Sequence, residues 1–389
     1  MLKHIICLLV AMTCSTLSPA SSSDDVTRIV NNPAEPESSV VIQLTEKFRI
    51  GEDEDDELIS HVRSVFLDSE GNICILDSHL KNLLIYNQSG ELLRHVGRKG
   101  AGPGEYEWPS SAFWLNGQYV ICQAYPGKFI LFYPDGIPAG NLKLDIQSLF
   151  LPIMEAGPVG DGLLGAFYSS IVEKHRHHDF SLFNLNGDMV QNIYHWESEE
   201  SMIDDLGIYD EMCPSQATEH LWTVTSSGTI YMALSFTDYT ITVQNIHGDT
   251  LMMIQRDYES IKRSSEEVSA RYQRREKWNA HAPRPPKVAI SEQHRDIQQI
   301  QIGPDGLLWV LPSNGVWKTP PGTVGIYDVF DEENVYVKRV ALRGEGVNAL
   351  TDGVWILSNG LVVVAKNQKA AHNVVEPEET ETSIICFTM

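Results

Sequence analysis

The chain has 389 residues, with 29 Lys and Arg against 52 Asp and Glu, which gives a formal net charge of −23 at pH 7. This balance argues against nucleic acid or an anionic lipid surface as a general partner, because both are bound through an excess of Lys and Arg. After the N-terminal stretch no apolar run approaches the roughly eighteen residues that a membrane-spanning helix requires, so we expect no transmembrane segment.

The N-terminal stretch has the layout of an export signal. A basic start is followed by an apolar run over residues 5–12 and by a small-residue sequence that ends at Ala20, where such a signal is removed. We therefore expect a signal peptide over residues 1–20, a flexible segment over 21–39, and a periplasmic or secreted protein. Lipid attachment at Cys14 is the second-ranked alternative, because Thr13 is a less usual residue before a lipidated cysteine.

The next part of the chain contains an internal repeat. Gly71 and Gly117 are 46 residues apart (117−71), as are Gly90 and Gly136 (136−90), and the surrounding segments VRSVFLDSEGNICILDSHLKNLLIYNQSGELLRHVG and SAFWLNGQYVICQAYPGKFILFYPDGIPAG correspond in residue type. A period of this length indicates a repeat array, in which each unit buries its apolar face against its neighbours.

Short alternating apolar runs separated by turn dipeptides predict four β-strands in the first unit, at residues 62–68, 72–77, 83–87 and 91–96. Glycine in the two tight hairpins supplies the positive φ that these turns require. The same template places the later units at 153–195, 219–258, 296–343 and from 347 onward.

The last unit is one strand short, and an unassigned strand, VVIQLTEKFRIG over residues 40–51, precedes the first. A ring closed by pairing the two chain ends in one sheet accounts for the missing strand and for the unassigned one, and it hides the sheet edges. The sequence therefore predicts an all-β fold: a six-bladed β-propeller of four-stranded antiparallel blades over residues 40–389. Its N-terminal strand joins the last blade, and a helical and proline-rich insertion at 259–295 separates blades four and five.

Within that insertion, the segment SSEEVSARYQRREKW predicts a short helix over residues 264–278. Ser264 or Ser265 can cap its N-terminus, and acidic residues in the first turn and basic residues near the end complement the helix dipole. The following HAPRPP prevents continuation. We expect this helix to lie as a cap or lid over one face of the ring.

These segments carry a family resemblance. ICILDSHLKNLLIYNQSGELLRHVG resembles an NHL-type propeller repeat, although Asn82 stands where many such repeats have Arg. GRKGAGPGEYEWP is similar to a Gly-Pro-Gly-Glu segment of exported bacterial six-bladed β-propeller proteins, and the helical insertion followed by IQIGPDGLLWV resembles one subgroup of them. The resemblance implies the fold far more than the chemistry, because this group includes lyases, lactonases, adhesion modules and scaffolds.

Insertions collect on one face of the predicted ring. The second-to-third hairpin of each blade and the link to the next blade emerge on the same face, here called the elaborated face. It receives all the long segments: 52–60, 98–109, 173–179, 196–218, 259–295, 313–322 and 366–381. Because loops on a rigid scaffold often carry function, we predict that this is the binding face, with the channel mouth at its centre. The alternative is that long loops merely tolerate insertion.

Two clusters offer metal ligands, and a simpler interpretation is preferred for each. The acidic run at 52–57 supplies oxygen ligands for Ca²⁺ but lacks the spacing of a calcium loop, and consecutive carboxylates ordinarily repel one another in solvent. His175, His177 and His178 beside Asp179 offer imidazoles for a transition metal. A hairpin tip has little to fix such ligands, so we interpret this run as an exposed polar turn.

Candidate binding residues come from two further places. Arg98, Lys99 and Glu105 lie in a glycine-rich link that can cradle an anion, although turning the chain is its preferred role. The starts of the innermost strands surround the channel mouth and supply the others: His61, Arg63, His220, His294, Arg295 and Asp296. Four tryptophans in or beside strands are interpreted as blade packing rather than as a ligand cage: Trp114, Trp222, Trp309 and Trp355.

Four cysteines follow the expected signal peptide. Cys74, Cys122 and Cys386 fall inside apolar runs, which favours free buried cysteines, although an exported chain with an even number of cysteines permits disulfides.

The favoured function is an exported, noncatalytic and monomeric propeller that binds a protein, peptide or glycan through the elaborated face. The alternative is a metal-dependent lyase or hydrolase, lactonase-like or amidating-lyase-like, with Ca or Zn held at the channel mouth by converging His, Asp or Glu. Binding is preferred because no nucleophile, acid–base pair or ligand spacing stands out in the sequence. No catalytic residue is therefore assigned.

Overall fold

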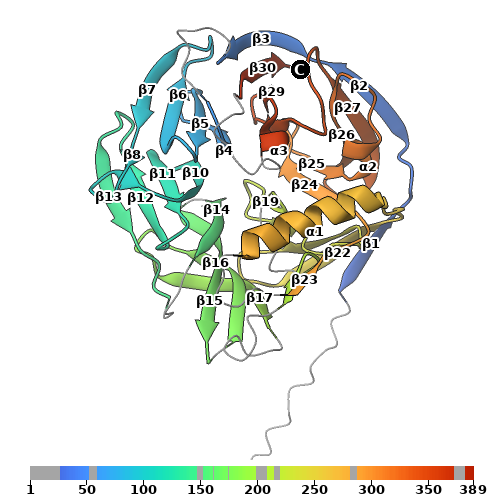
Figure 1. The fold of residues 1–389 in the computed structure, drawn as a ribbon, viewed down its shortest axis with the longest axis horizontal. Helices are drawn as coiled ribbons and strands as arrows, with labels where there is room; N and C mark the ends of the chain where they lie inside the picture. Colours follow the sequence, from blue (N-terminus) through green and yellow to red (C-terminus); the bar gives the residue numbers. More distant parts are fainter. Residues whose placement is uncertain are drawn as a thin grey trace, which may run out of the picture.

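The computed structural model shows a ring of six β-sheet blades around a central axis (Figure 1). Each blade contributes its first strand to the inside of the ring, as the repeat predicts. The turn glycines Gly71, Gly90, Gly117 and Gly136 all adopt positive φ, between 74° and 88°. The structure describes residues 27–51, 59–146, 152–160, 162–173, 175–198, 208–213, 220–280, 287–371 and 382–389.

The first three blades are four-stranded and antiparallel, with strands in chain order from the axis outward. Blade one contains β4 (Val62–Leu67), β5 (Ile73–Asp77), β6 (Asn82–Tyr86) and β7 (Leu92–Val96). Blade two contains β10 (Pro109–Leu115), β11 (Gln118–Gln123), β12 (Lys128–Phe132) and β13 (Pro138–Leu142). Blade three contains β14 (Ile153–Val159), β15 (Leu163–Val172), β16 (His175–Phe183) and β17 (Met189–Glu197).

The other three blades recruit strands from the N-terminal part of the chain. Blade four contains β19 (Trp222–Val224), β20 (Ile230–Met232), β21 (Thr240–Gln244), β22 (Thr250–Arg256) and, outermost, β1 (Arg28–Asn32). Blade five contains β24 (Ile297–Ile302), β25 (Leu308–Pro312), β26 (Thr323–Phe330), β27 (Tyr336–Arg343) and, outermost, β2 (Ser38–Gln43). Blade six contains β28 (Gly353–Ile356), β29 (Leu361–Ala365), β30 (Ile384–Thr388) and β3 (Thr45–Ile50).

Ring closure by an N-terminal strand is therefore confirmed, because β3 pairs with β30. Two details of the prediction are wrong. The expected strand at 40–51 is divided between β2 and β3, and the expected flexible segment at 21–39 contains β1 and the start of β2. Both added strands run parallel to an outer strand, β1 along β22 and β2 along β27. They pair with backbone groups that these blade edges would otherwise present to solvent.

The core lies between the blades. Within the described residues, each adjacent pair of blades encloses its own buried cluster. Strand alternation sends Ile121 to the cluster shared with blade one and its neighbour Cys122 to the cluster shared with blade three. The middle strands of the blades are therefore buried on both faces, and their sequences are nearly continuous apolar runs. Cys74, Cys122 and Cys386 are free and buried, as predicted.

The elaborated face carries the helices. α1 (Ser265–Asn279) is the predicted helix of the insertion, and a capping box joins Ser264 and Glu267 at its N-terminus. Two one-turn helices, α2 (Asn314–Trp317) and α3 (Gln368–Ala371), follow the second strands of blades five and six. Two small parallel pairs complete this face, β8 (Arg98–Lys99) with β9 (Glu105–Tyr106), and β18 (Ile208–Asp210) with β23 (Lys287–Ala289).

One expected loop is strand instead. The segment at 173–179 was predicted to be a long hairpin tip, but β15 continues to Val172 and β16 begins at His175, with the two strands paired in register. The acidic run at 52–57 lies outside the described residues. No helix in the described part of the chain is long and apolar enough to span a membrane.

Candidate binding site in the central channel

A cavity of about 890 Å³ occupies the elaborated-face end of the central channel. The innermost strands of all six blades line it, which places it on the axis of the ring. Arg271 and Arg274 of α1, Val316 and Trp317 of α2, and Gln368 and Lys369 of α3 also line the cavity. The predicted lid helix therefore contributes directly to its wall.

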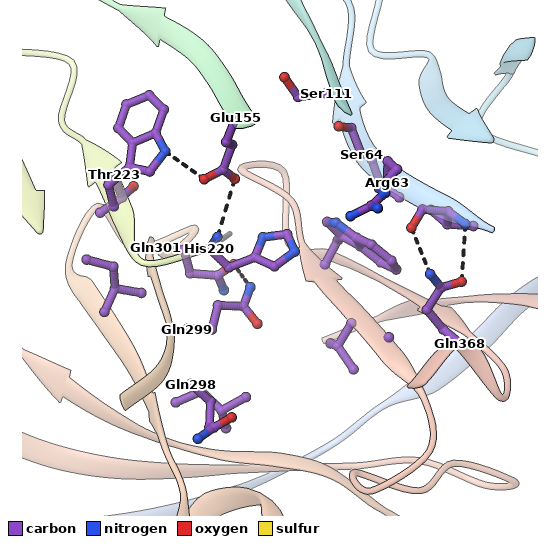
Figure 2. A pocket seen from close by; sticks show the side chains of 18 of the residues that line it. Arg63, Ser64, Ser111, Glu155, His220, Thr223, Gln298, Gln299, Gln301 and Gln368 are labelled. Atoms are coloured by element: carbon purple, nitrogen blue, oxygen red, sulfur yellow. Dashed lines mark hydrogen bonds between the residues drawn. The ribbon is translucent and has the colours of Figure 1, made fainter. Parts of the chain in front are cut away.

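Hydrogen bonds between blades stabilise this wall (Figure 2). Ser64 Oγ of blade one accepts from the backbone N–H of Ala112 in blade two at 3.0 Å, and Ser111 Oγ accepts from Ala156 in blade three at 3.1 Å. The Gln368 amide closes the ring, since its nitrogen donates to Val62 O at 2.9 Å and its oxygen accepts from Val62 N at 3.1 Å.

Glu155 belongs to this structural ring. Its Oε2 accepts from Trp222 Nε1 at 2.9 Å, and its Oε1 accepts from the backbone N–H of His220 at 3.3 Å (Figure 2). The carboxylate of blade three is therefore engaged by blade four. These two hydrogen bonds give Glu155 a structural role in the cavity wall, and they do not assign it a catalytic role.

The lining is cationic, although the whole chain is strongly acidic. Its basic side chains are Arg63, Arg271, Arg274 and Lys369, whereas Glu155 supplies the carboxylate among the described lining residues. Arg271 is also held by Glu211, with 3.0 Å between its guanidinium nitrogen and Oε1.

Lys369 reaches the wall from α3. Its Nζ donates to Ala349 O at 2.7 Å, and burial lowers the pKa of this amine to about 8. It therefore remains mainly protonated at neutral pH.

Neutral hydrogen-bonding groups and aromatic rings complete the cavity. Gln298, Gln299 and Gln301 of β24 line one side, and Gln299 Nε2 donates to Gln301 Oε1 at 3.2 Å (Figure 2). Trp222 and Trp355, which the sequence assigned to blade packing, line the cavity as well as contacting the interblade clusters. A concave site with apolar surface and a few directed polar groups is the usual form of a ligand pocket.

Of the binding residues expected from sequence, Arg63 and His220 line this cavity. His61 lies just before β4, where its Nδ1 is 2.7 Å from Ser78 Oγ. His294 packs against Trp317, with 3.9 Å between ring centroids, outside the cavity lining.

Two other predicted residues beside His294 also lie outside the lining. Arg295 stacks over Phe236 and donates to the backbone oxygen of Ser235 at 3.0 Å. Asp296 is only 1% exposed, and burial raises its pKa to about 6.

The glycine-rich link forms a compact turn. Arg98 and Glu105 form an ion pair of 2.8 Å, and Glu105 Oε2 accepts from the Gly102 N–H at 2.8 Å. Tyr106 anchors the turn by donating to Val96 O at 3.0 Å. Arg98, Lys99 and Glu105 are not part of the cavity wall, and their contacts support the structural role that the sequence favoured.

The described residues of the channel mouth do not form a group of three or more His, Cys, Asp or Glu close enough to share a metal ion. The group that does meet this condition, His177, His195 and Glu197, lies in blade three. The channel instead offers cations and amides, a set suited to binding an anionic group.

Sequence reasoning missed several residues of the cavity. Arg271 and Arg274 are three positions apart on the predicted helix, so they lie on one side of it, and this spacing was a usable signal. Gln368 and Lys369 gave no such signal, because they reach the axis only through the fold of blade six.

Comparison with known proteins supports the fold. The model of the 6-bladed β-propeller family DUF5128 matches residues 23–242, more than half of the 389-residue chain. No curated protein matches the sequence.

Solved structures of similar fold include a candidate exported protein from Bacteroides fragilis, at 13% identity and a TM-score of 0.51, covering 93% of this chain and 99% of that one. A DUF4221 member from Bacteroides vulgatus is similar at 11% identity and a TM-score of 0.50, covering 89% and 97%. At these identities the likeness shows the fold alone.

Proposed function

The chain belongs to the 6-bladed β-propeller family DUF5128, and we propose that this member is an exported, noncatalytic binding protein whose central cavity takes an acidic oligosaccharide. The observation that carries the proposal is the gathering of Arg63, Arg271, Arg274 and Lys369 in one cavity of a chain with a net charge of −23. Guanidinium groups match carboxylates in shape and charge.

The neutral part of the lining favours a sugar acid over a simple inorganic anion. Gln298, Gln299 and Gln301 offer donors and acceptors for hydroxyl groups, and Trp222 and Trp355 offer apolar surface for the carbon faces of a sugar ring. A cavity of about 890 Å³ accommodates a ligand of several sugar rings.

A metal-dependent lyase or hydrolase at the channel mouth is the competing function. It needs three or more metal ligands converging there, and the described channel residues do not form such a group. Binding is therefore the function that the geometry supports better.

The test is calorimetric titration with a galacturonate oligosaccharide and with its methyl-esterified form, which has the same length but no carboxylate charge. We expect that only the acidic form binds and that salt weakens its binding. Arg274→Gln should lower the affinity about tenfold or more, because a hydrogen bond to a charged group is worth about 1.5–3 kcal/mol. Arg98→Gln, outside the cavity, is the matched control. Equal binding of the two forms would overturn the proposal.

Export forms part of this proposal and rests on the N-terminal sequence layout. N-terminal sequencing of mature protein recovered from a cell-envelope or culture fraction tests it. We expect Ser21 as the first residue, whereas retention of residues 1–20 on an intracellular protein would contradict export.

A further inference from the structure

A second candidate site lies away from the channel, in blade three, where β16 begins and β17 ends. These two ends belong to the elaborated face, because β16 follows the second-to-third hairpin and β17 leads to the next blade. In the antiparallel pairing His177 lies opposite Glu197, and Asp179 lies opposite His195. Since side chains alternate along a strand, these four residues share one face of the sheet.

Three of these side chains are close enough to hold one ion. One ligand atom from each of His177, His195 and Glu197 lies within 4.8 Å of the other two. Metal bonds of about 2.0–2.2 Å place tetrahedral ligand atoms roughly 3.3 Å apart. Glu197, whose side chain is 47% exposed, has room to rotate toward the two imidazoles.

A buried carboxylate orients one of the ligands. Asp179, whose side chain is 8% exposed, accepts a 2.7 Å hydrogen bond from His195 Nδ1 and a 3.0 Å hydrogen bond from Asn192 Nδ2. This bond fixes the tautomer of His195 with its Nε2 lone pair available. Metal-binding histidines ordinarily donate their second ring N–H to a carboxylate in this way.

The neighbouring histidines have other contacts. His178 points to the opposite face, where it is fully buried, stacks on Phe167 and lies 3.1 Å from Ser169 Oγ. His175 Nδ1 is 2.9 Å from Ser198 O and 3.6 Å from Glu197 Oε1, beside the three-residue group.

We propose that His177, His195 and Glu197 bind a divalent transition-metal ion, best matched by Zn²⁺, with Asp179 as the positioning residue. Two imidazole nitrogens and one carboxylate oxygen are a common zinc ligand set, and three protein ligands leave a coordination position for water or a ligand. The sequence favoured an exposed turn because a hairpin tip cannot orient such ligands. In the structure, the paired strands β16 and β17 and the hydrogen bond from His195 to Asp179 orient these side chains.

The test is titration of untagged, chelator-treated full-length protein with ZnCl₂ by calorimetry, with thermal unfolding as a second readout. We expect one Zn²⁺ per chain and a higher unfolding temperature with zinc. His195→Ala and Glu197→Gln should each weaken binding by about 10-fold or more, and Asp179→Asn by about 10- to 100-fold. His79→Ala, which changes an exposed histidine between β5 and β6 of blade one, should bind as the wild type.

Glu197→Gln changes an exposed side chain and tests the site even if Asp179→Asn folds poorly. Co²⁺ binding adds a spectroscopic readout, because its visible absorption reports coordination by the protein. Failure to bind zinc at a defined stoichiometry, or unchanged zinc binding in both His195→Ala and Glu197→Gln, would overturn the proposal. Neither outcome bears on carbohydrate binding in the channel.

Discussion

The indole Nε1 of Trp222 donates a 2.9 Å hydrogen bond to Glu155 Oε2 across the junction of blades three and four. Glu155→Ala removes the acceptor for this donor and for the His220 N–H, so we expect a loss of about 1–3 kcal/mol of unfolding free energy. Glu155→Gln keeps one oxygen acceptor and should fall between the wild type and Ala. Urea unfolding measures the series. Unchanged stability in Glu155→Ala would show that these two hydrogen bonds do not stabilise the junction.

Arg256 and Asp328 form a buried ion pair between blades four and five, with side chains 3% and 1% exposed. Asp328 also accepts hydrogen bonds from Tyr239 and Tyr336. Asp328→Ala leaves the guanidinium buried without its counter-ion, which should cost about 3–5 kcal/mol. The double variant Arg256→Met/Asp328→Leu should recover part of that loss, because it removes the buried charge but leaves the hydroxyls of Tyr239 and Tyr336 without this acceptor. Chemical denaturation of the two variants checks this, and a double variant no more stable than Asp328→Ala would contradict the interpretation.

Asn32 attaches the N-terminal arm, defined as β1 through β2, to the ring. Its side chain donates to Gln255 O at 3.2 Å and Asn334 O at 3.3 Å, and it accepts from Tyr336 N at 2.8 Å. Deleting residues 21–43 should leave closure by β3 possible but expose the edges of β22 and β27, which favours edge-to-edge association. Light scattering on the purified deletion variant is the measurement. A monodisperse monomer with wild-type stability would show that the arm is dispensable.

We expect His294, which is 3% exposed and lies 3.7 Å from Glu267 of α1, to make the free energy of unfolding depend on pH. Burial lowers its pKa to about 4, assisted by Arg263 and Arg271 and opposed by Glu267 and Glu211. An unfolded histidine has a pKa of about 6.5, so between these values the unfolded chain binds more protons. The contribution of the neutral, buried His294 to the free energy of unfolding is therefore complete above about pH 6.5, and it decreases as the pH falls toward 4.

We expect this effect to reach about 2 kcal/mol between pH 7 and pH 5. Asp296 is next to His294 in the chain, and its raised pKa should change stability with pH in the opposite direction. The measurement is therefore the difference in urea midpoints between the wild type and His294→Gln at the two pH values. The wild type should lose more stability on acidification than the variant. Parallel losses in both proteins would show that His294 does not titrate in this range.

Much of the fold follows from local sequence. Turn glycines such as Gly71 require positive φ, apolar alternation marks the strands, and Ser264 with Glu267 marks the start of α1, because each of these signals acts within a few residues. Ring closure was also predictable, since one unit lacked a strand that the other end of the chain supplied. The parallel addition of β1 to β22 was not, because a short exposed strand does not specify which of several blade edges it will pair with.

The candidate sites depended far more on tertiary structure. Lys369, Arg63 and Arg271 are far apart in sequence and share a cavity only because α3, the inner strand β4 and α1 meet at the axis of the ring. His177 and His195 lie on the same face of the sheet only in the observed register, and a shift by one residue would turn either side chain to the opposite face. The sequence by itself determined the repeat, the propeller and the elaborated face, because these depend on local pattern and chain order. Only the folded ring decided which cationic side chains, and which histidine and carboxylate side chains, come together, because that depends on long-range register and closure.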